Sequence, residues 1–359
     1  MRAAAGTTCP ACGETVGPAD SFCEACGREL SEVAVSTGAP SPTASCPGCG
    51  SPRISADGYC EQCGHKAPAG RDHVEIDLGT IAGVTDRGLR HHRNEDAMAL
   101  AAPVTQNGPA AIAVVCDGVS TSGRPDEASL AAAQAGARAL LAAFRSGAGA
   151  ADASERAMAA AADAVARLVN DTDNTDNKEN TGNRGNAEDT RRSANAPATT
   201  YISALITGSE VTLCWAGDSR AYWLPATPDA TPALLTRDDS WGAELVEAGS
   251  LSEAEAAAWP QSHVITRWLG TDAGSAAPHV QTLAVTGPGV VLLCSDGLWN
   301  YCPAPARLTE LALTAAPADL LGAAAALVMF AIKAGGQDNI TVVLARMPPV
   351  STDPRSVPE

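Results

Sequence analysis

Three aspartates stand where buried strands or glycine-rich turns meet, positions at which carboxylates could bind a cation. Asp117 closes the apolar run VVCD, Asp296 follows LLCS, and Asp338 lies in GGQDNIT. A carboxylate at the end of a buried strand is costly unless a cation lies close to it. Oxygen ligands supplemented by waters suit Mg²⁺ or Mn²⁺. Each aspartate alone would be interpreted as a turn or cap residue, whereas the three together favour a metal site.

A second set of candidate ligands is a duplicated cysteine pattern. The stretches CPACGETVGPADSFCEACG and CPGCGSPRISADGYCEQCG each contain two Cys-x-x-Cys pairs, and every cysteine of the second copy lies 37 positions after its counterpart. Four thiolates complete a tetrahedral zinc site and leave no position for substrate, so both sites are predicted to be structural. Units this small depend on the metal for folding, with a contribution on the order of 10 kcal/mol. The predicted zinc ligands are Cys9, Cys12, Cys23, Cys26, Cys46, Cys49, Cys60 and Cys63.

Two other interpretations of these cysteines are less favoured. Disulfides are typical of small secreted domains, but the chain starts MRAAAGTTCP, without an apolar stretch of signal-peptide length. A redox-active Cys-x-x-Cys pair normally lies within a strand and helix pattern, which does not surround these pairs. The remaining four cysteines are predicted to be packing residues: Cys116, Cys214, Cys294 and Cys302.

The aspartates must be positioned by a strand-rich region that occupies most of the chain. Unbroken apolar runs predict buried strands at 111–116 and 290–294, and both lead to an aspartate. Helical spacing of apolar residues predicts helices around 130–144, 158–168 and 317–334. Further strands are predicted at 199–207, 211–215, 221–224 and 340–345. Because several strands follow one another without an intervening helix, we expect largely antiparallel sheets.

The composition excludes several classes of protein. The 359 residues include 24 basic and 41 acidic side chains, so the formal net charge is −17 and no nucleic-acid ligand is expected. Hydrophobic residues make up 45 % and aromatic residues 4 %, which predicts a core of small aliphatic side chains. The longest apolar run, 320–332, is too short to cross a bilayer. We therefore expect a cytoplasmic protein with no membrane segment.

Changes of composition along the chain predict its domain boundaries. The residues between the two cysteine repeats are small and polar, which is typical of a flexible linker. Residues 170–196 contain no large apolar side chain and are predicted to be a disordered insert. The predicted units are a first zinc ribbon (1–30), a linker (31–45), a second ribbon (46–70), the strand-rich domain (74–346) and a disordered tail (347–359).

Short motifs along the strand-rich domain occur in an order that resembles the metal-dependent serine/threonine protein phosphatases, type 2C. The motifs are Asp86-Arg87-Gly88, Asn94-Glu95-Asp96, Asp117-Gly118, Ala198-Thr199-Thr200, Ala216-Gly217-Asp218-Ser219-Arg220, Ser295-Asp296-Gly297 and Gly335-Gly336-Gln337-Asp338-Asn339. The similarity covers roughly Ile76 to Ala345. It implies an α+β fold, a four-layer α-β-β-α sandwich of two antiparallel sheets. The cysteine repeat is similar to tandem zinc ribbons, so two small zinc ribbons would precede the sandwich.

The resemblance also implies a centre that holds two Mn²⁺ or Mg²⁺ ions. Asp117 would bridge the ions, and the carbonyl of Gly118 would join the first of them. Asp296 and Asp338 would complete the second. A hydroxide formed between the ions would attack phosphorus in line, so no phosphoenzyme and no cysteine nucleophile is required.

Further residues of the centre follow from the same resemblance. Glu95 and Asp96 match positions that hold metal-bound waters, and Asp218 matches a ligand of a third, weaker ion. His91 stands where the family usually has an arginine that grips the substrate phosphate. Histidine cannot make the bidentate, permanently charged contact of arginine. The neighbouring arginines are therefore candidates for that contact together with it: Arg90 and Arg93.

Two other departures from the family pattern affect the expected chemistry. Val119 stands where eukaryotic members often carry a histidine that acts as a general acid, so protonation of the leaving group is unassigned. Asp239 stands where histidine is common, and we expect it to add negative charge near the cleft.

The resulting hypothesis is a phosphoprotein phosphatase of bacterial signalling, which hydrolyses phosphoserine and phosphothreonine by attack of a metal-bridging hydroxide. Its expected partners are phosphorylated proteins, namely a Ser/Thr kinase or the substrates of that kinase, and a protein that binds the zinc ribbons. The alternative is a pseudophosphatase or scaffold that keeps the fold but binds phosphoproteins without hydrolysing them, and His91 motivates it. A nucleic-acid-reading role for the ribbons is disfavoured by the acidic charge.

Overall fold

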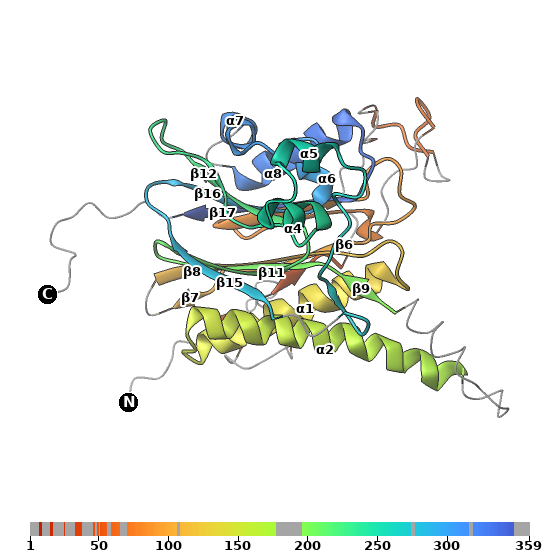
Figure 1. Cartoon of the computed structure of the whole chain (residues 1–359). Helices are drawn as coiled ribbons and strands as arrows, with labels where there is room; N and C mark the ends of the chain where they lie inside the picture. The colour runs from red at the N-terminus through yellow and green to blue at the C-terminus, as the bar shows by residue number, and fades with distance from the viewer. Residues whose placement is uncertain are drawn as a thin grey trace, which may run out of the picture.

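A computed structural model of the chain (Figure 1) provides the positions of most residues. The described residues are 7–8, 15–16, 25, 33–37, 46, 49, 51–55, 59–64, 70–105, 108–176, 196–273, 277–315 and 319–347. Within these ranges, no helix is both long enough and apolar enough to cross a membrane.

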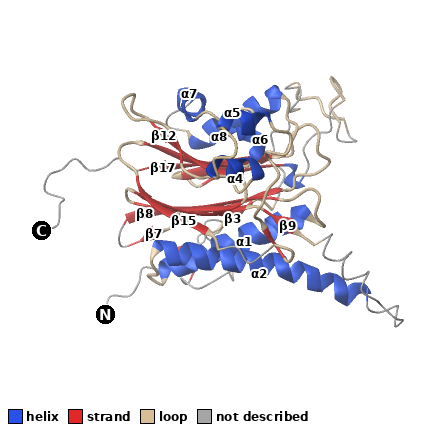
Figure 2. Cartoon of the chain, viewed as in Figure 1, coloured by secondary structure: helices blue, strands red, loops and turns tan. Residues whose placement is uncertain are grey.

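Two antiparallel sheets lie face to face at the centre of the molecule (Figure 2). The larger sheet has the strand order β15-β11-β10-β8-β6-β3, and the smaller has the order β13-β12-β16-β17-β5-β4. The larger sheet contains β3 (Ala34–Val35), β6 (Asp96–Ala101), β8 (Gly108–Asp117), β10 (Tyr201–Thr207), β11 (Glu210–Ala216) and β15 (His279–Ala284), with β7 (Val104–Thr105) paired to β8. The smaller contains β4 (His73–Asp77), β5 (Ile81–Asp86), β12 (Arg220–Pro225), β13 (Ala233–Leu234), β16 (Gly289–Cys294) and β17 (Ile340–Met347).

Helices cover the outer faces of both sheets (Figure 1). The long helices α1 (Pro125–Arg145) and α2 (Ala150–Asp176) pack on the larger sheet, while α7 (Pro305–Ala315) and α8 (Leu320–Ala334) pack on the smaller one. The predicted four-layer α-β-β-α sandwich is therefore confirmed. The shorter elements are β1 (Thr7–Thr8), β2 (Thr15–Val16), η1 (Gly70–Asp72), β9 (Ala198–Thr199), α4 (Trp241–Glu247), α5 (Glu253–Ala258), β14 (Leu269–Gly270) and α6 (Asp296–Trp299).

Strand β8 shows why the predicted apolar runs are unbroken. Ile112 and Val114 pack against α1 and α2, whereas the alternate residues Ala113 and Val115 pack between the two sheets. Because successive side chains of a strand point to opposite faces, a strand covered on both faces must be apolar throughout. The same burial applies to β16, whose six residues are all buried. Both strands therefore deliver an aspartate to the same buried edge of the sandwich.

The segment between the cysteine repeats differs from the expected flexible linker at residues 33–37. Ala34 and Val35 pair with Leu100 and Ala99 of β6, so β3 is the outer strand of the larger sheet. The backbone N–H of Ser36 donates to the Met98 carbonyl at 3.0 Å, and its hydroxyl accepts the Met98 N–H at 3.0 Å. Val33 is buried in the core beneath α1 and α2. This segment is thus part of the sandwich.

Two other elements differ from the sequence-based expectations. Helix α2 continues to Asp176, into the segment expected to be disordered, because each added residue of an established helix gains a hydrogen bond at small cost. Residues 177–195 of that predicted insert, and the predicted tail at 348–359, lie outside the described residues. Helix α8 starts at Leu320, where the carboxylate of Asp319 accepts the N–H of Gly322 and caps the helix.

Candidate metal centre

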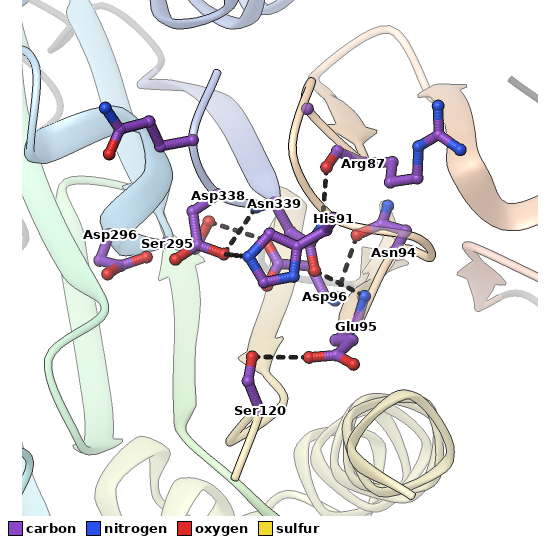
Figure 3. Close-up of polar contacts among 12 residues, drawn as sticks. Arg87, His91, Asn94, Glu95, Asp96, Ser120, Ser295, Asp296, Asp338 and Asn339 are labelled. Atoms are coloured by element: carbon purple, nitrogen blue, oxygen red, sulfur yellow. Dashed lines mark hydrogen bonds and ion pairs between the residues drawn. The ribbon is translucent and has the colours of Figure 1, made fainter. Parts of the chain in front are cut away.

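Five aspartates form an acidic cluster at one edge of the two sheets: Asp96, Asp117, Asp218, Asp296 and Asp338. Asp96 starts β6 and Asp117 ends β8, and the two residues pair directly in the antiparallel register. Asp296 is the first residue of α6, and Asp338 lies just before β17. The chain therefore brings carboxylates from both sheets to one edge, and Figure 3 shows Asp96, Asp296 and Asp338 of this group.

The cluster is buried and electrostatically crowded. Burial raises the pKa of Asp117 well above its usual value, and the charges of the other four aspartates raise it further. The pKa of Asp296 is likewise raised well above its usual value by burial and by Asp218, Asp338 and Asp96. Burial raises the pKa of Asp96 to about 6 and, with the charge of Asp238, that of Asp218 to about 7. Crowding of this kind is relieved when cations bind between the carboxylates.

Unpartnered oxygen atoms show that the cluster suits a cation. Oδ1 of Asp96 and Oδ1 of Asp296 are buried, and neither accepts a hydrogen bond. The second oxygen of Asp96 accepts the hydroxyls of Ser295 at 2.8 Å and Thr341 at 2.7 Å, which fixes the orientation of the carboxylate. Buried anionic oxygens without a donor are costly, and a divalent ion would satisfy them.

Gly118 is required where the backbone turns beside the cluster. A Cβ atom at this position would lie 2.5 Å from the Pro125 carbonyl oxygen and 2.8 Å from that of Glu95. The N–H of Gly118 donates to the same Glu95 carbonyl at 3.2 Å. A larger residue would push the Asp117 strand away from Glu95. Glycine is therefore needed to keep the predicted ligand pair, Asp117 and the Gly118 carbonyl, in place.

Two of the carboxylates are engaged by neighbouring side chains. Nε2 of His91 lies 3.1 Å from Oδ1 of Asp338, and the N–H of Asn339 donates to the same oxygen at 2.8 Å. Burial would raise the pKa of Asp338, but these two contacts outweigh it and lower the pKa. Nδ2 of Asn300 donates to Asp296 at 3.1 Å. A cation bound directly by Asp338 would compete with the histidine contact.

Glu95 lies beside the cluster, and its carboxylate is contacted by the guanidinium of Arg93 and the hydroxyl of Ser120. Its carboxylate accepts Nε of Arg93 at 3.0 Å and the hydroxyl of Ser120 at 2.6 Å. Its backbone N–H donates to Oδ1 of Asn339 at 2.7 Å, which ties it to the Asp338 loop. Figure 3 shows the contacts of Glu95 with Ser120 and with Asn339, which lies just before β17.

A depression of about 370 Å³ lies next to these residues. It is lined by Arg90, His91, His92, Arg93 and Glu95. All three residues predicted for the phosphate contact therefore line one depression, although His91 and Arg93 are already paired with acids. The structure thus brings the three basic residues together at one surface.

Asp239, which was expected to add negative charge near the cleft, does not lie open in the cleft. Its side chain is 2 % exposed, and Oδ1 lies 2.8 Å from Nε2 of His279. Nε of Arg267 lies 3.6 Å from the same oxygen. The carboxylate is therefore buried against residues that are distant in the sequence.

Several residues that support the centre were given no role in the sequence analysis. Ser295 and Thr341 orient Asp96, and Asn339 joins three segments of the chain through its side chain. Arg71 donates to the backbone carbonyls of Asp126 at 2.9 Å and Asp96 at 3.2 Å. Ser295 and Asn339 stand inside the motifs themselves, so their neighbourhood to Asp296 and Asp338 was a usable signal.

The second cysteine repeat closes into a compact group. Within the described part of the chain, Cys46, Cys49, Cys60 and Cys63 form the one group of three or more potential ligands whose atoms all lie within 4.8 Å of one another. Burial would raise the pKa of Cys60, but backbone N–H groups at Cys63 and Gln62 lower it to about 6, which favours the thiolate. The four cysteines of the first repeat lie outside the described residues.

Comparisons with known proteins agree with this arrangement. The protein phosphatase 2C family matches residues 87–316, and the double zinc ribbon family matches residues 9–64. The chain belongs to the protein phosphatase 2C family. Among phosphatase 2C relatives, the serine/threonine phosphatase stp of Listeria welshimeri is 31 % identical over 157 residues. That match covers 44 % of this chain and 59 % of the relative, so it spans less than two thirds of the relative's length.

Solved structures of phosphatases share the fold. Serine/threonine phosphatase Stp1 from Staphylococcus aureus has a TM-score of 0.57 at 22 % identity, and the match covers 77 % of this chain and 98 % of Stp1. The catalytic domain of the phosphatase PstP, in complex with two manganese ions, has a TM-score of 0.50 at 22 % identity, with 75 % and 98 % covered. At this identity the likeness supports the phosphatase 2C fold alone.

Proposed function

We propose that the chain is a protein serine/threonine phosphatase that depends on two Mn²⁺ or Mg²⁺ ions. The observation that carries the proposal is the acidic cluster, in which buried oxygens of Asp96 and Asp296 lack any hydrogen-bond donor. Membership of the phosphatase 2C family and the two manganese ions of the PstP catalytic domain support the same chemistry. When bound, such ions supply a water of lowered pKa and neutralise charge on the phosphoryl oxygens.

Individual roles follow for the acids. Asp117 and the Gly118 carbonyl would hold the first ion, and Asp117 would be shared with a second ion held by Asp296 and Asp338. Glu95 and Asp96 would fix waters, for which Asp96 is preoriented by Ser295 and Thr341. Asp218 would contribute to a third, weaker ion.

The basic depression would receive the substrate phosphate. Arg90, His91 and Arg93 line it beside the acidic cluster, and the side chain of Arg93 is 53 % exposed although it contacts Glu95. Arginine can exchange such a partly exposed partner for a phosphate oxygen at small cost. We propose that the substrates are phosphorylated proteins, in particular a Ser/Thr kinase or its targets.

The ribbons would have a structural role. We propose one zinc ion for each repeat, in units that cover residues 1–30 and 46–70, and a protein partner for their surface. The cysteine group around Cys46 supports this for the second unit. A cytoplasmic location stays a prediction from the sequence.

The pseudophosphatase alternative receives less support. Its motive was His91, which lies against Asp338 and leaves the other acids of the cluster in place. Loss of one phosphate contact weakens substrate binding, whereas the loss of a metal ligand would remove the chemistry.

Hydrolysis of a phosphothreonine peptide with and without Mn²⁺ tests the proposal. We expect Mn²⁺-dependent release of phosphate by the full chain, and a loss of at least about a hundredfold in Asp117→Asn and Asp296→Asn. Asp229→Asn, an exposed aspartate in the hairpin between β12 and β13, is the matched control and should retain wild-type activity. A wild-type chain that binds two Mn²⁺ ions but releases no phosphate would establish the pseudophosphatase instead.

A further inference from the structure

The turn that presents Asp218 to the acidic cluster lies between β11 and β12. We call residues 217–219 the Asp218 turn. Asp218 is 6 % exposed, and its backbone carbonyl accepts the indole N–H of Trp299, in the helix that starts at Asp296. A cation bound between the two carboxylates would therefore depend on how the turn is held.

Asp239 holds the turn on its N-terminal side. Its Oδ2 accepts the N–H of Gly217 at 3.1 Å, and its own N–H donates to the Gly217 carbonyl at 2.9 Å. Its Oδ1 lies 2.8 Å from Nε2 of His279, and the imidazole stacks on Trp215 at 4.9 Å between ring centroids. The carboxylate is thus held by His279 of β15 as well as by the turn.

Gly217 allows this contact because of its backbone conformation. Its φ angle is +113°, and a Cβ atom would lie 2.7 Å from Cβ of Thr200. The turn therefore combines a left-handed residue with a close approach to the neighbouring strand, a conformation that needs support from outside the turn.

Asp238 holds the turn on its C-terminal side. Its two oxygens accept Nε and Nη2 of Arg220 at 2.9 and 2.7 Å, a bidentate contact in which both side chains are mostly buried. The guanidinium of Arg220 lies 3.7 Å above the ring of Trp299. The adjacent residues Asp238 and Asp239 thus hold the two ends of the Asp218 turn.

Trp299 connects the turn to the partner carboxylate. Its indole N–H donates to the Asp218 carbonyl at 2.9 Å. Trp299 is the last residue of α6, whose first residue is Asp296. The Asp218 turn and the helix that carries Asp296 are therefore joined through one rigid side chain.

We propose that Asp238 and Asp239 are positioning residues that fix Asp218 relative to Asp296, and so set the affinity of the cluster for the cation these two acids share. The inference deepens the proposed function and rests on it for the identity of the cation. A carboxylate that is already oriented loses little conformational freedom when it binds an ion. Without these contacts the turn would have to become ordered on binding, and this ordering would weaken the affinity for the cation.

Isothermal titration of the full chain with Mn²⁺ tests the inference. We expect Asp239→Asn, which keeps the size of the side chain but removes the charged acceptor, to weaken the weakest Mn²⁺ binding step by about tenfold. Asp238→Asn acts on the opposite side of the turn and should change affinity in the same direction. Asp272→Asn is the matched control, because this exposed aspartate accepts the indole N–H of Trp268 without contacting the turn, and its Mn²⁺ affinity should stay within twofold of wild type.

Kinetics provide a second readout that a general loss of stability does not produce. The Mn²⁺ concentration for half-maximal hydrolysis should rise in Asp239→Asn, while the KM for peptide at saturating Mn²⁺ stays at the wild-type value. Folded protein is confirmed by urea denaturation in chelator, and if Asp239→Asn does not fold, Asp238→Asn decides the question. Unchanged Mn²⁺ affinity in the folded variant overturns the inference. If the wild-type chain hydrolyses no phosphopeptide, the proposed function fails, but the titration still decides whether the two aspartates position Asp218.

Discussion

The imidazole of His91 contacts the carboxylate of Asp338, with 3.1 Å between Nε2 and Oδ1. The hydrogen bond to Asp338 is the main cause of a raised pKa for His91. His91, at the position expected to contact phosphate, thus points at Asp338, a predicted metal ligand. A cation bound at Asp338 would therefore either share the carboxylate with His91 or displace the histidine.

This relationship predicts that removal of His91 favours metal binding. His91→Ala frees Asp338 from a hydrogen bond worth about 1 kcal/mol and removes nearby positive charge, so Mn²⁺ should bind about fivefold more tightly. Isothermal titration measures the change. His92→Ala, at the exposed neighbouring position, should leave the affinity as in the wild type. Weaker binding in His91→Ala would instead make this histidine part of the metal site.

Asp296→Asn should separate stability from metal binding. The raised pKa of Asp296 means that its charge destabilises the folded protein, and that stability is regained as the pH falls from the folded pKa toward the lower unfolded value. In chelator at pH 7 the variant should therefore be more stable by on the order of 1 kcal/mol. Thermal denaturation with EDTA and with Mn²⁺ checks this, since excess Mn²⁺ should reverse the order. A lower melting temperature in EDTA would contradict the expected repulsion.

His73 predicts a pH dependence of stability away from the metal centre. Burial alone would lower the pKa of His73, but hydrogen bonds to Asp86 at 2.7 Å and Glu75 at 3.2 Å outweigh it and raise the pKa. The stabilisation is fully present below the unfolded pKa of about 6.5 and is lost as the pH rises through the higher folded value. His73→Gln should therefore cost about 1 kcal/mol at pH 6 and little at pH 9, as measured by urea denaturation. An equal loss at both pH values would exclude a contribution from the imidazolium.

The outer strand β3 predicts a contribution of the inter-ribbon segment to the stability of the sandwich. Val33→Ala removes two buried methyl groups from the core and should lower the free energy of unfolding by about 1.5 kcal/mol. Thr37→Ala, four residues on at an exposed position, is the control and should have no effect. Thermal denaturation of the full chain distinguishes the two variants. Equal melting temperatures would show that the segment does not dock in solution.

Zinc content tests the second cysteine group. Cys49→Ser removes one of four thiolates and should lower the zinc content by one ion per chain, as measured by mass spectrometry of the metal. Glu61→Ala changes an exposed residue between two ligands and should retain all zinc. Retention of the same zinc content in Cys49→Ser would show that the group does not bind zinc through four thiolates.

The parts of the fold that the sequence could predict are those with a local signal. The apolar runs before Asp117 and Asp296 are buried strands because both of their faces are covered, and this is visible in the residue types alone. The motif order then predicted which acids meet. Neither prediction depends on which distant segment of the chain packs beside these residues.

The parts that escaped prediction depend on partners far away in the chain. Residues 33–37 are small and polar like a linker, and they become a strand only because β6 offers a free edge about sixty residues later. The local motif of Asp239 likewise gives no sign of His279, which contacts it from β15 at 2.8 Å. Residue propensity and motif spacing cannot predict such long-range contacts.

The position of β3 also bears on how the protein behaves at high concentration. An uncovered outer strand offers a row of backbone donors and acceptors to the same strand of another molecule, which is a common route to aggregation. Here the chain covers part of that row on β6 with its own residues, Ala34 to Ser36. The segment between the cysteine repeats therefore gives this sheet a very short outer strand, which offers another molecule fewer backbone groups than β6 would.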